Sequence, residues 1–225
     1  MTNHRLDLIS TSDGSPTVRH SRFAETYHSV HGAVTESMHV FIGAGLDFFR
    51  KNHPQTDRLH FFEMGLGTGL NALLTYRRMK GTGVRVRYDA VDKFPLKEWE
   101  KLDYVRNEDE KTFFHRLHTL DCDSEGLMAD FFRLSKNCCD IYDFPFRESR
   151  YHVIYYDAFS PATQPELWTP ELFTHMYRSL VPGGVWVTYV AKGQVRRDLQ
   201  AAGFRVERLP GPPGKREMLR AVKEG

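Results

Sequence analysis

The sequence predicts an α/β fold in which strands and helices alternate around a mostly parallel sheet. A glycine-rich turn between an apolar strand and an apolar helix, at residues 59–74, is typical of a nucleotide-binding βα unit. A second run, residues 151–156, is apolar throughout and is typical of a strand buried on both faces. The chain has 225 residues, of which 40% are hydrophobic and 27% are charged, so it can bury the core of one such domain.

The N-terminal part of the chain predicts an extension ahead of the sheet. β-Prone runs on both sides of the Asp13-Gly14 turn favour a hairpin. From about Ala33 onward, apolar residues recur at helical spacing. We therefore expect residues 1–57 to form a small hairpin and helix extension that packs on the core, and residues 58–225 to form the main domain.

The glycine-rich turn indicates what kind of ligand the main domain holds. Gly65, Gly67 and Gly69 have the spacing of a turn that a ligand can approach closely. Leu70 stands where a dinucleotide fingerprint requires glycine or alanine, so the pattern is G-x-G-x-G. Glu63 ends the strand, and its carboxylate would repel a pyrophosphate but suit an ammonium or sulfonium group. S-adenosylmethionine (SAM) is such a ligand, and a purely structural glycine turn is the alternative.

Acidic residues follow three further predicted strands. The strand beginning near Val84 ends at Asp92, where a carboxylate can accept hydrogen bonds from both hydroxyls of a ribose. A short strand leads to Asp140, which can reach an adenine amino group. The strand 151–156 ends at Asp157, at the edge where α/β enzymes present their ligands. Acids that are merely solvated in loops are the alternative.

The remaining elements complete the α/β order. Residues 97–130 are charged and aromatic and favour helix, with no chemistry that the pattern assigns. A helix begins at Pro170 with Thr169 as its N-cap, residues 182–184 end it, and residues 185–190 form the next strand. The last part is typical of a helix, a strand, a Pro/Gly turn and a final strand, which predicts an antiparallel edge hairpin.

The cysteines and the N-terminal residues give information about the cellular compartment of the protein. Cys122, Cys138 and Cys139 form no C-x-x-C pair, and we expect them to be reduced thiols. The H-x-x-H pairs lack a third ligand nearby, so we expect no metal site. There is no charged-then-apolar leader and no apolar run of about 18 residues, which predicts a cytoplasmic protein without a membrane span.

The charge is unevenly distributed although the formal net charge is only +2. The segment from residue 192 to residue 220 contains eight Lys or Arg residues but only three acidic residues. Such a patch attracts phosphate backbones, and ordinary solvated surface charge is the alternative.

Several sequence blocks closely resemble the tRNA wobble-uridine methyltransferases of the MnmD type, which correspond to the methyltransferase half of the bifunctional MnmC. The matching blocks include YHSVHGAVTESMHVFI, EMGLGTGLNALL, VDKFPL, YYDAFSPATQPELWT, VPGGVWVTYVAKGQVRR and LPGPPGKREMLRA. The glycine block is shared by many class I methyltransferases, whereas the DAFSP and PGPPGKREML blocks are more specific. The resemblance implies a class I SAM-dependent methyltransferase fold, with a mostly parallel seven-stranded sheet whose last strand is antiparallel.

The resemblance also implies a reaction. It is the SAM-dependent methylation of the amine of 5-aminomethyluridine, usually 2-thiolated, at the tRNA wobble position. The chain is too short to supply the flavin-dependent half of MnmC as well, so we expect no flavin. The expected partner is the anticodon arm of tRNA, and the oligomeric state stays open, a monomer being compatible with the sequence.

Site residues follow from the same blocks. SAM is expected to contact Glu63, Gly65, Gly67, Thr68, Gly69, Asn71, Asp92, Lys93 and Asp140. Substrate contacts are expected from Tyr27, Ser29, Glu36, Phe159, Pro161, Lys192, Arg196, Arg197, Lys215 and Arg216. Phe159 and the prolines after it would wall the amine pocket, and Lys215 and Arg216 would hold anticodon phosphates together with the basic cluster before them.

Asp157 matches the family's D-x-F block and would face the substrate amine. An alkyl amine has a pKa of about 10.4 and an ordinary aspartate one of about 3.9, so an ordinary aspartate is a poor base for that proton. We expect Asp157 to accept an N–H hydrogen bond and orient the amine, while the proton leaves to water.

Two other classes of function stay open at this point. One is a small-molecule amine methyl- or aminopropyltransferase of the same fold, which activity on a free diamine without tRNA would reveal. The other is a non-catalytic RNA-binding module that retains the fold, which absence of SAM binding would support.

Overall fold

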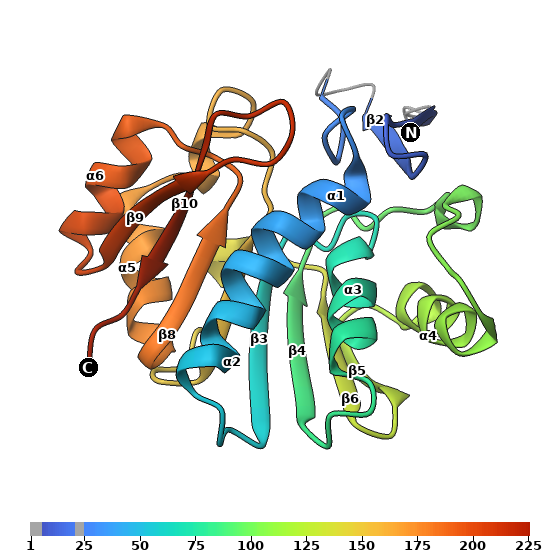
Figure 1. Ribbon diagram of the computed structural model, residues 1–225, viewed down its shortest axis with the longest axis horizontal. Coiled ribbons are helices and arrows are strands. Elements are labelled where there is room, and N and C mark those ends of the chain that lie inside the picture. Colours follow the sequence, from blue (N-terminus) through green and yellow to red (C-terminus); the bar gives the residue numbers. More distant parts are fainter. Residues whose placement is uncertain (1–5, 21–24) are drawn as a thin grey trace.

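The computed structural model describes residues 6–20 and 25–225, and an eight-stranded sheet lies at the centre of this part (Figure 1). The strand order is β5-β6-β4-β3-β7-β8-β10-β9. The strands are β3 (Arg58–Met64), β4 (Arg85–Val91), β5 (Ser124–Ala129), β6 (Phe132–Asn137), β7 (Tyr151–Tyr156), β8 (Leu180–Thr188), β9 (Arg205–Pro210) and β10 (Glu217–Val222).

The strand directions confirm the predicted class I methyltransferase fold. Strands β6, β4, β3, β7 and β8 pair in parallel, and β10 is antiparallel to both β8 and β9. The predicted terminal hairpin is therefore present, with β10 lying inside the sheet and β9 at its edge. The expected number of seven strands is wrong for the described residues, because β5 adds an antiparallel strand beside β6. Residues 124–129 lie within the charged segment that favours helix by composition, so this strand has little sequence signal.

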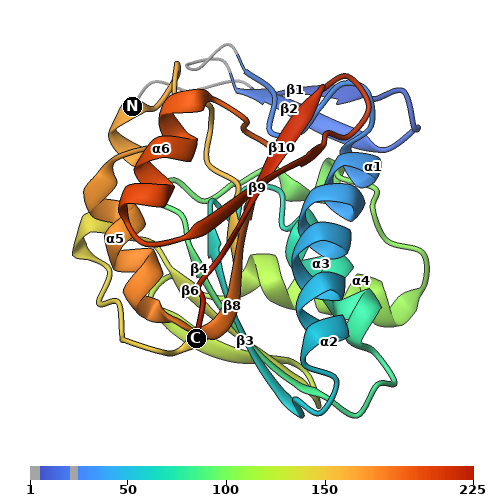
Figure 2. The same ribbon diagram turned by 60° about the vertical axis from the view of Figure 1, so that its left-hand side comes forward.

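Helices cover both faces of the sheet (Figures 1 and 2). One face carries α3 (Leu70–Met79), α4 (Glu108–Thr119) and a long helix that consists of α1 (Ala33–Ser37), the π-helical stretch η1 (Met38–Asp47) and α2 (Phe48–Asn52). The other face carries α5 (Pro170–Ser179) and α6 (Gly193–Ala201). Short 3-10 turns occur at Trp99–Lys101, Ile141–Asp143 and Pro165–Leu167. No helix in the described part of the chain is long and apolar enough to cross a membrane.

The two faces form two separate apolar cores. Along β7, Val153 and Tyr155 belong to the core beneath the long N-terminal helix, whereas Ile154 and Tyr156 belong to the core beneath α5 and α6. This arrangement explains why the strand is apolar and aromatic apart from the half-buried His152, since both of its faces are covered.

The long N-terminal helix lies unusually close to the sheet. A Cβ atom at Gly45 would stand 3.1 Å from Val187 Cγ2 and 3.2 Å from Tyr155 Cε1, so a larger residue there would push the helix away from β7 and β8. The helix fixes the position of its N-terminal turns, and through them the segment that precedes it, over the carboxyl ends of the strands.

The N-terminal hairpin is attached to the start of this helix. Strands β1 (Leu6–Ser10) and β2 (Pro16–His20) pair antiparallel, as predicted. The carboxylate of Asp13 in their turn accepts hydrogen bonds from the backbone and the hydroxyl of Thr35 in α1, at 2.8 and 2.7 Å. These hydrogen bonds, together with one from Ser15, hold the pKa of Asp13 well below its usual value despite the opposing effect of burial.

The expectation of reduced thiols at all three cysteines is wrong. Cys122 and Cys138 form a disulfide, and Cys139 is free. Cys122 precedes β5 and Cys138 follows β6, and the antiparallel pairing of these strands brings the two Cα atoms to 5.3 Å. Sequence reasoning could not foresee the pair because it did not foresee β5.

Candidate functional site

A cavity of about 400 Å³ opens at the carboxyl ends of the parallel strands. This size and this position are typical of a small-molecule site in an α/β fold. Its walls come from the loops after β3, β4, β6 and β7 and from the N-terminal extension. The lining residues include Tyr27, His28, Gly65, Gly67, Thr68, Asp92, Lys93, Phe94, Asp140, Tyr142, Asp157, Phe159 and Tyr189.

The glycine turn after β3 forms the floor of this cavity. Gly65 and Gly67 have φ values of +84° and +50°, a conformation that favours glycine. A Cβ atom at Gly65 would stand 2.9 Å from the carbonyl oxygen of Asp157, and one at Gly67 would stand 2.9 Å from the ring of Tyr27. The backbone can therefore approach neighbouring loops and a ligand only because these positions lack side chains.

The loops after β4 and β6 hold charged groups at one end of the cavity. Asp92 accepts hydrogen bonds from the backbone N–H groups of Gly67 and Phe94, both at 2.9 Å, and so ties the β4 loop to the glycine turn. Lys93 donates to Asp140 at 2.9 Å and thereby connects the β4 loop to the β6 loop. The exposed rings of Phe94 and Tyr142 lie on the same side of the cavity, where they can cover a planar base.

A buried polar network lies beneath the glycine turn. Glu63 is fully buried and accepts hydrogen bonds from Asn71 Nδ2 at 2.9 Å and from the hydroxyl of Tyr88 at 2.8 Å. The same Asn71 amide nitrogen donates to Asp157 Oδ2 at 2.8 Å. Burial raises the pKa of Glu63 well above its usual value, and the Asp157 carboxylate also raises it.

This network fits a ligand that carries positive charge. Two carboxylates converge on one amide group, and among the described residues Asn71 Oδ1 is buried without a hydrogen-bond partner. A cationic ammonium or sulfonium group placed here would stabilise both carboxylates in their ionised form. The negative charge of this network therefore suits SAM, whose ammonium group and sulfonium centre are positively charged.

Asp157 is not the ordinary aspartate that its place in the sequence predicts. Burial raises its pKa to about 7, and the nearby Glu36 carboxylate adds to this effect against the hydrogen bond from Asn71 and the charge of Lys215. The premise of an ordinary aspartate therefore does not hold, because the pKa of Asp157 lies near neutral pH and closer to that of the amine.

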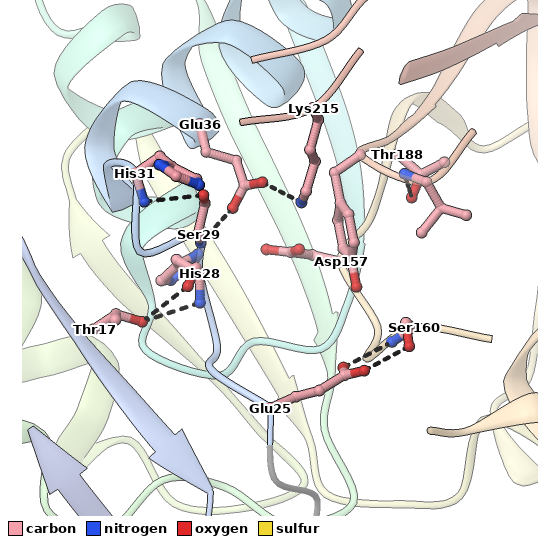
Figure 3. Close-up of polar contacts among 12 residues, drawn as sticks. Thr17, Glu25, His28, Ser29, His31, Glu36, Asp157, Ser160, Thr188 and Lys215 are labelled. Carbon is pink, nitrogen blue, oxygen red and sulfur yellow. Dashed lines mark hydrogen bonds and ion pairs between the residues drawn. The ribbon is translucent and has the colours of Figure 1, made fainter. Parts of the chain in front are cut away.

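Three charged side chains from distant parts of the chain converge next to the cavity (Figure 3). Glu36 comes from α1, Asp157 follows β7, and Lys215 lies in the turn between β9 and β10. Lys215 forms an ion pair with Glu36, and its Nζ atom lies 3.7 Å from the centre of the Tyr189 ring. The backbone N–H of Ser29 donates to the other oxygen of Glu36 at 2.7 Å.

This arrangement corrects the expectation for Lys215. The sequence predicts Lys215 and Arg216 as phosphate-binding cations, but Lys215 forms its ion pair with a carboxylate that is 5% exposed. Arg216 is exposed and remains available to an external anion.

Glu25 is a site residue that sequence reasoning missed. Its carboxylate accepts hydrogen bonds from the backbone and hydroxyl of Ser160, at 3.2 and 2.6 Å, and from the hydroxyl of Thr163 at 2.5 Å (Figure 3). These contacts join the N-terminal extension to the loop after Asp157. Two residues further on, Tyr27 packs edge-on against Phe159, with ring centres 5.2 Å apart. No sequence signal links Glu25 to a loop 135 residues away.

Two histidines support the glycine turn from below. His28 Nε2 lies 2.6 Å from the hydroxyl of Thr68, and His118 Nε2 lies 3.2 Å from the carbonyl oxygen of Thr68. Burial lowers the pKa of His28 to about 4 and that of His118 to about 3, so both rings are neutral at pH 7. Trp99 stacks on His118 with ring centres 4.9 Å apart. Residues 97–130 thus support the site indirectly.

Several expected site residues lie outside the cavity wall. Gly69 begins α3, where a Cβ atom would stand 2.9 Å from Leu117, and Pro161 belongs to the loop after Asp157 without lining the cavity. Glu63 and Asn71, both expected to contact SAM, are buried and do not line the cavity either. The basic residues of α6 and its N-terminus also lie away from it. Lys192 and Arg197 are exposed, and Arg196 is partly buried.

Comparison with known proteins relates this site to others. Residues 112–224 match a family described as S-adenosyl-L-methionine-dependent methyltransferase. A curated relative from Pseudomonas savastanoi pv. phaseolicola is named tRNA 5-methylaminomethyl-2-thiouridine biosynthesis bifunctional protein MnmC. It is 29% identical over 99% of this chain, and the chain spans 35% of that protein's length.

Solved structures share the fold. A crystal structure of MNMC2 from Aquifex aeolicus matches with a TM-score of 0.84 at 23% identity, over 100% of this chain and 72% of the other. A probable spermidine synthase from Corynebacterium glutamicum matches with a TM-score of 0.56 at 17% identity, over 98% of this chain and 77% of the other. Together with the family match, they confirm the class I methyltransferase fold that the sequence blocks imply.

Proposed function

Because the chain belongs to the S-adenosyl-L-methionine-dependent methyltransferases, we propose that it methylates the amine of 5-aminomethyluridine, 2-thiolated or not, at the wobble position of tRNA. The product is 5-methylaminomethyluridine or its 2-thio form. The name of the curated relative supports this substrate. The observation that carries the proposal most directly is Asp157, a carboxylate of nearly neutral pKa between the cofactor cavity and the Glu36–Lys215 pair.

In this proposal the cofactor lies along the cavity. The glycine turn with Thr68 would hold its amino acid part, with the buried Glu63 and Asn71 acting on it from behind the cavity wall through their charge and dipole. Asp92 would accept hydrogen bonds from its ribose, and Lys93 and Asp140 would bind its adenine. When bound, SAM supplies a methyl group on a positively charged sulfur, from which a nucleophile can take it. The aromatic rings of Phe94 and Tyr142 cover the base.

The chain's own residues prepare the nucleophile. An alkyl ammonium group has a pKa of about 10.4, so an ordinary aspartate at about 3.9 would face a difference of about 6.5 units. The pKa of about 7 for Asp157 reduces that difference to about 3.4 units. Asp157 accepts the proton from the substrate nitrogen through its carboxylate and orients the lone pair toward the methyl carbon. Bound SAM would supply the methyl group to this nitrogen, with the carbon–sulfur bond replaced by a nitrogen–carbon bond and its electron pair left on sulfur. Asp157 releases the proton to water.

The surroundings of Asp157 exclude water and position the base. Phe159 and Tyr27 form an edge-on pair at one wall, and the hydroxyl of Tyr189 donates to the carbonyl oxygen of Ala158 at 3.0 Å. An unstacked base can pack against such rings, which is how proteins usually read single-stranded RNA loops. Lys192, Arg196, Arg197 and Arg216 form the basic surface that we assign to the anticodon arm. A tRNA substrate implies that the chain acts in the cytoplasm.

The experiment that tests this function uses labelled SAM and tRNA from cells that lack the activity. Transfer of label should occur with the wild-type chain, and nucleoside mass analysis should find the methyl group on the aminomethyl nitrogen. Asp157→Asn should reduce transfer by about 100-fold or more while SAM binding by calorimetry persists. Label found on a free diamine instead, with none on tRNA, would contradict the proposal and favour a small-molecule amine transferase.

A further inference from the structure

The ion pair between Glu36 and Lys215 is largely buried, so Lys215 is poorly placed to bind a phosphate group of RNA at the protein surface. Glu36 is 5% exposed at its side chain and Lys215 is 31% exposed. Lys215 has a second partner in the ring of Tyr189, at 3.7 Å, and that ring lines the cavity. A lysine fixed between a buried carboxylate and an aromatic face is held for an effect inside the protein.

Asp157 is the group on which this pair acts. The charge of Glu36 raises the pKa of Asp157 and the charge of Lys215 lowers it, so the two members of the pair oppose each other at one carboxyl group. Asn71 Nδ2 donates to Oδ2 of Asp157 at 2.8 Å, and Asp157 lines the cavity, so its carboxyl group is accessible to a ligand there. The remaining groups that act on this cluster are Glu63 on β3, Tyr88 on β4, Tyr189 after β8, and Glu25 and His28 in the N-terminal extension.

We propose that Lys215 is a positioning residue that keeps Asp157 ionised at neutral pH beside Glu36, and so sets the pH at which the amine can lose its proton. This inference rests on the proposed function. Without Lys215, Asp157 would stand next to an uncompensated carboxylate in a buried site. It would then keep its own proton at neutral pH and could not accept one from the substrate.

The two partners should shift the pH dependence of kcat in opposite directions. Activity rises with pH as Asp157 ionises, so Lys215→Met should move the rising limb to higher pH by about one unit or more. At pH values below that limb, each unit corresponds to about a tenfold loss of rate. Glu36→Gln should move the limb to lower pH, because it removes the repelling carboxylate and leaves the charge of Lys215 uncompensated.

Two further variants separate this role from a structural one. The double variant Glu36→Gln/Lys215→Met removes both charges, and its limb should lie close to that of the wild type. Lys215→Arg keeps the cation and should retain most of the wild-type profile. The matched control is Lys80→Met, which breaks an exposed lysine–carboxylate pair with Asp109, far from the cavity, and should leave the limb in place.

A direct titration makes the test independent of turnover. Aspartate carboxyl carbons can be labelled with ¹³C and followed by NMR against pH, with the Asp157 signal assigned by its loss in Asp157→Asn. The midpoint should move upward in Lys215→Met and downward in Glu36→Gln, in the folded chain without tRNA. Shifts in the same direction, or none in either variant, would overturn the inference. If instead the wild-type chain transfers no methyl group to tRNA, the proposed function fails while the titration still decides the role of Lys215.

Discussion

Asn71 connects two carboxylates that have different tasks. It donates from one amide nitrogen to Glu63 and to Asp157, and so keeps the residue assigned to the cofactor and the residue assigned to the amine in a fixed relation. Both carboxylates have raised pKa values because both are removed from water. In the chain without ligands, such carboxylates lower the free energy of unfolding at neutral pH.

Replacing Glu63 by glutamine should therefore stabilise the unliganded chain while weakening its binding of SAM. The folded pKa of Glu63 is raised above the unfolded value of about 4.3, so its contribution to stability decreases as pH rises between the two values. Glu63→Gln abolishes this decrease, and urea unfolding should show it to be more stable than the wild type by about 1 kcal/mol or more at pH 8 but not at pH 4. Calorimetry should find SAM binding about tenfold weaker or worse. An equal stability difference at both pH values would contradict the prediction.

The sequence predicted the positions of the acidic site residues better than it predicted which side chains contact one another. Asp92, Asp140 and Asp157 could be assigned because strand ends meet at one edge of a parallel sheet, which is a property of the fold. The inward direction of Lys215 and the role of Glu25 could not be assigned. Both depend on contacts between distant segments, and neither residue type nor spacing records them.

Among the elements, the segment from residue 25 to residue 36 has the widest set of contacts. Glu25 binds the loop after β7, His28 binds the glycine turn after β3, and Glu36 binds the turn between β9 and β10. One short segment thus contacts two loops that line the cavity and the turn between β9 and β10.

Loss of the Glu25 carboxylate should affect catalysis with tRNA and leave the binding of SAM unchanged. Glu25→Ala removes the acceptor for Ser160 and Thr163, so the loop that follows Asp157 is no longer held in place. We expect kcat/KM for tRNA to fall about 10- to 100-fold. Glu25→Gln keeps an acceptor oxygen and should recover most of the activity.

A matched control for Glu25 is Glu171→Ala on α5, whose carboxylate is exposed and lies 3.9 Å from His175. It should leave kcat/KM unchanged. A loss of SAM affinity in Glu25→Ala, measured by calorimetry, would show instead that the change spreads to the glycine turn.

The β5–β6 hairpin contributes through its disulfide. Cys122 and Cys138 are separated by 16 positions in the sequence. In the chain-entropy description, a disulfide that closes a loop of this length raises the free energy of unfolding by about 3 kcal/mol. We expect reduction with dithiothreitol, or Cys122→Ser, to lower the melting temperature by several degrees, about as that free energy implies. Cys139→Ser should not. Equal melting temperatures with and without reductant would show that the pair contributes nothing to stability.

Sequence reasoning found the elements with strong periodicity and missed the weak one. The sequence predicted the glycine unit, the buried strand β7 and the terminal hairpin. In each of them, apolar residues occupy the positions that face the core, so the pattern is clear. Strand β5 has exposed residues at alternate positions and only Met128 is buried, so its composition resembles that of the charged helix before it. The disulfide was missed for the same reason.

At the scale of the whole molecule, basic residues lie at both ends of the sheet. The carboxyl end holds the cavity and, nearby, Arg216. The amino end holds a second cavity of about 430 Å³ lined by Arg58, Arg85, Arg87 and Arg133, together with His60 and Asp130. Because the proposed reaction takes place at the carboxyl end, only the first of these surfaces can hold the anticodon arm.

Charge reversal should distinguish the two basic surfaces. Arg216→Glu should weaken tRNA binding and reduce the slope of log K against log salt by about 1 for the lost phosphate contact. Arg87→Glu, at the opposite end, should change neither quantity. Filter binding or fluorescence anisotropy over a salt series measures both. If the slope decreased only for Arg87→Glu, the result would indicate that RNA binds at the amino end of the strands and would contradict the prediction.

The segment from residue 25 to residue 36 also makes activity depend on the fraction of molecules in which this segment is docked on the rest of the chain. Its contacts reach across 135 and 179 positions of the chain, whereas the sheet beneath it is complete without them. Detaching the segment therefore leaves a folded molecule that lacks a finished site. The apparent dissociation constant for RNA is the intrinsic one divided by the fraction of molecules in which the segment is seated. Variants of Glu25 should change that fraction, and so alter apparent affinity without any contact between this residue and RNA.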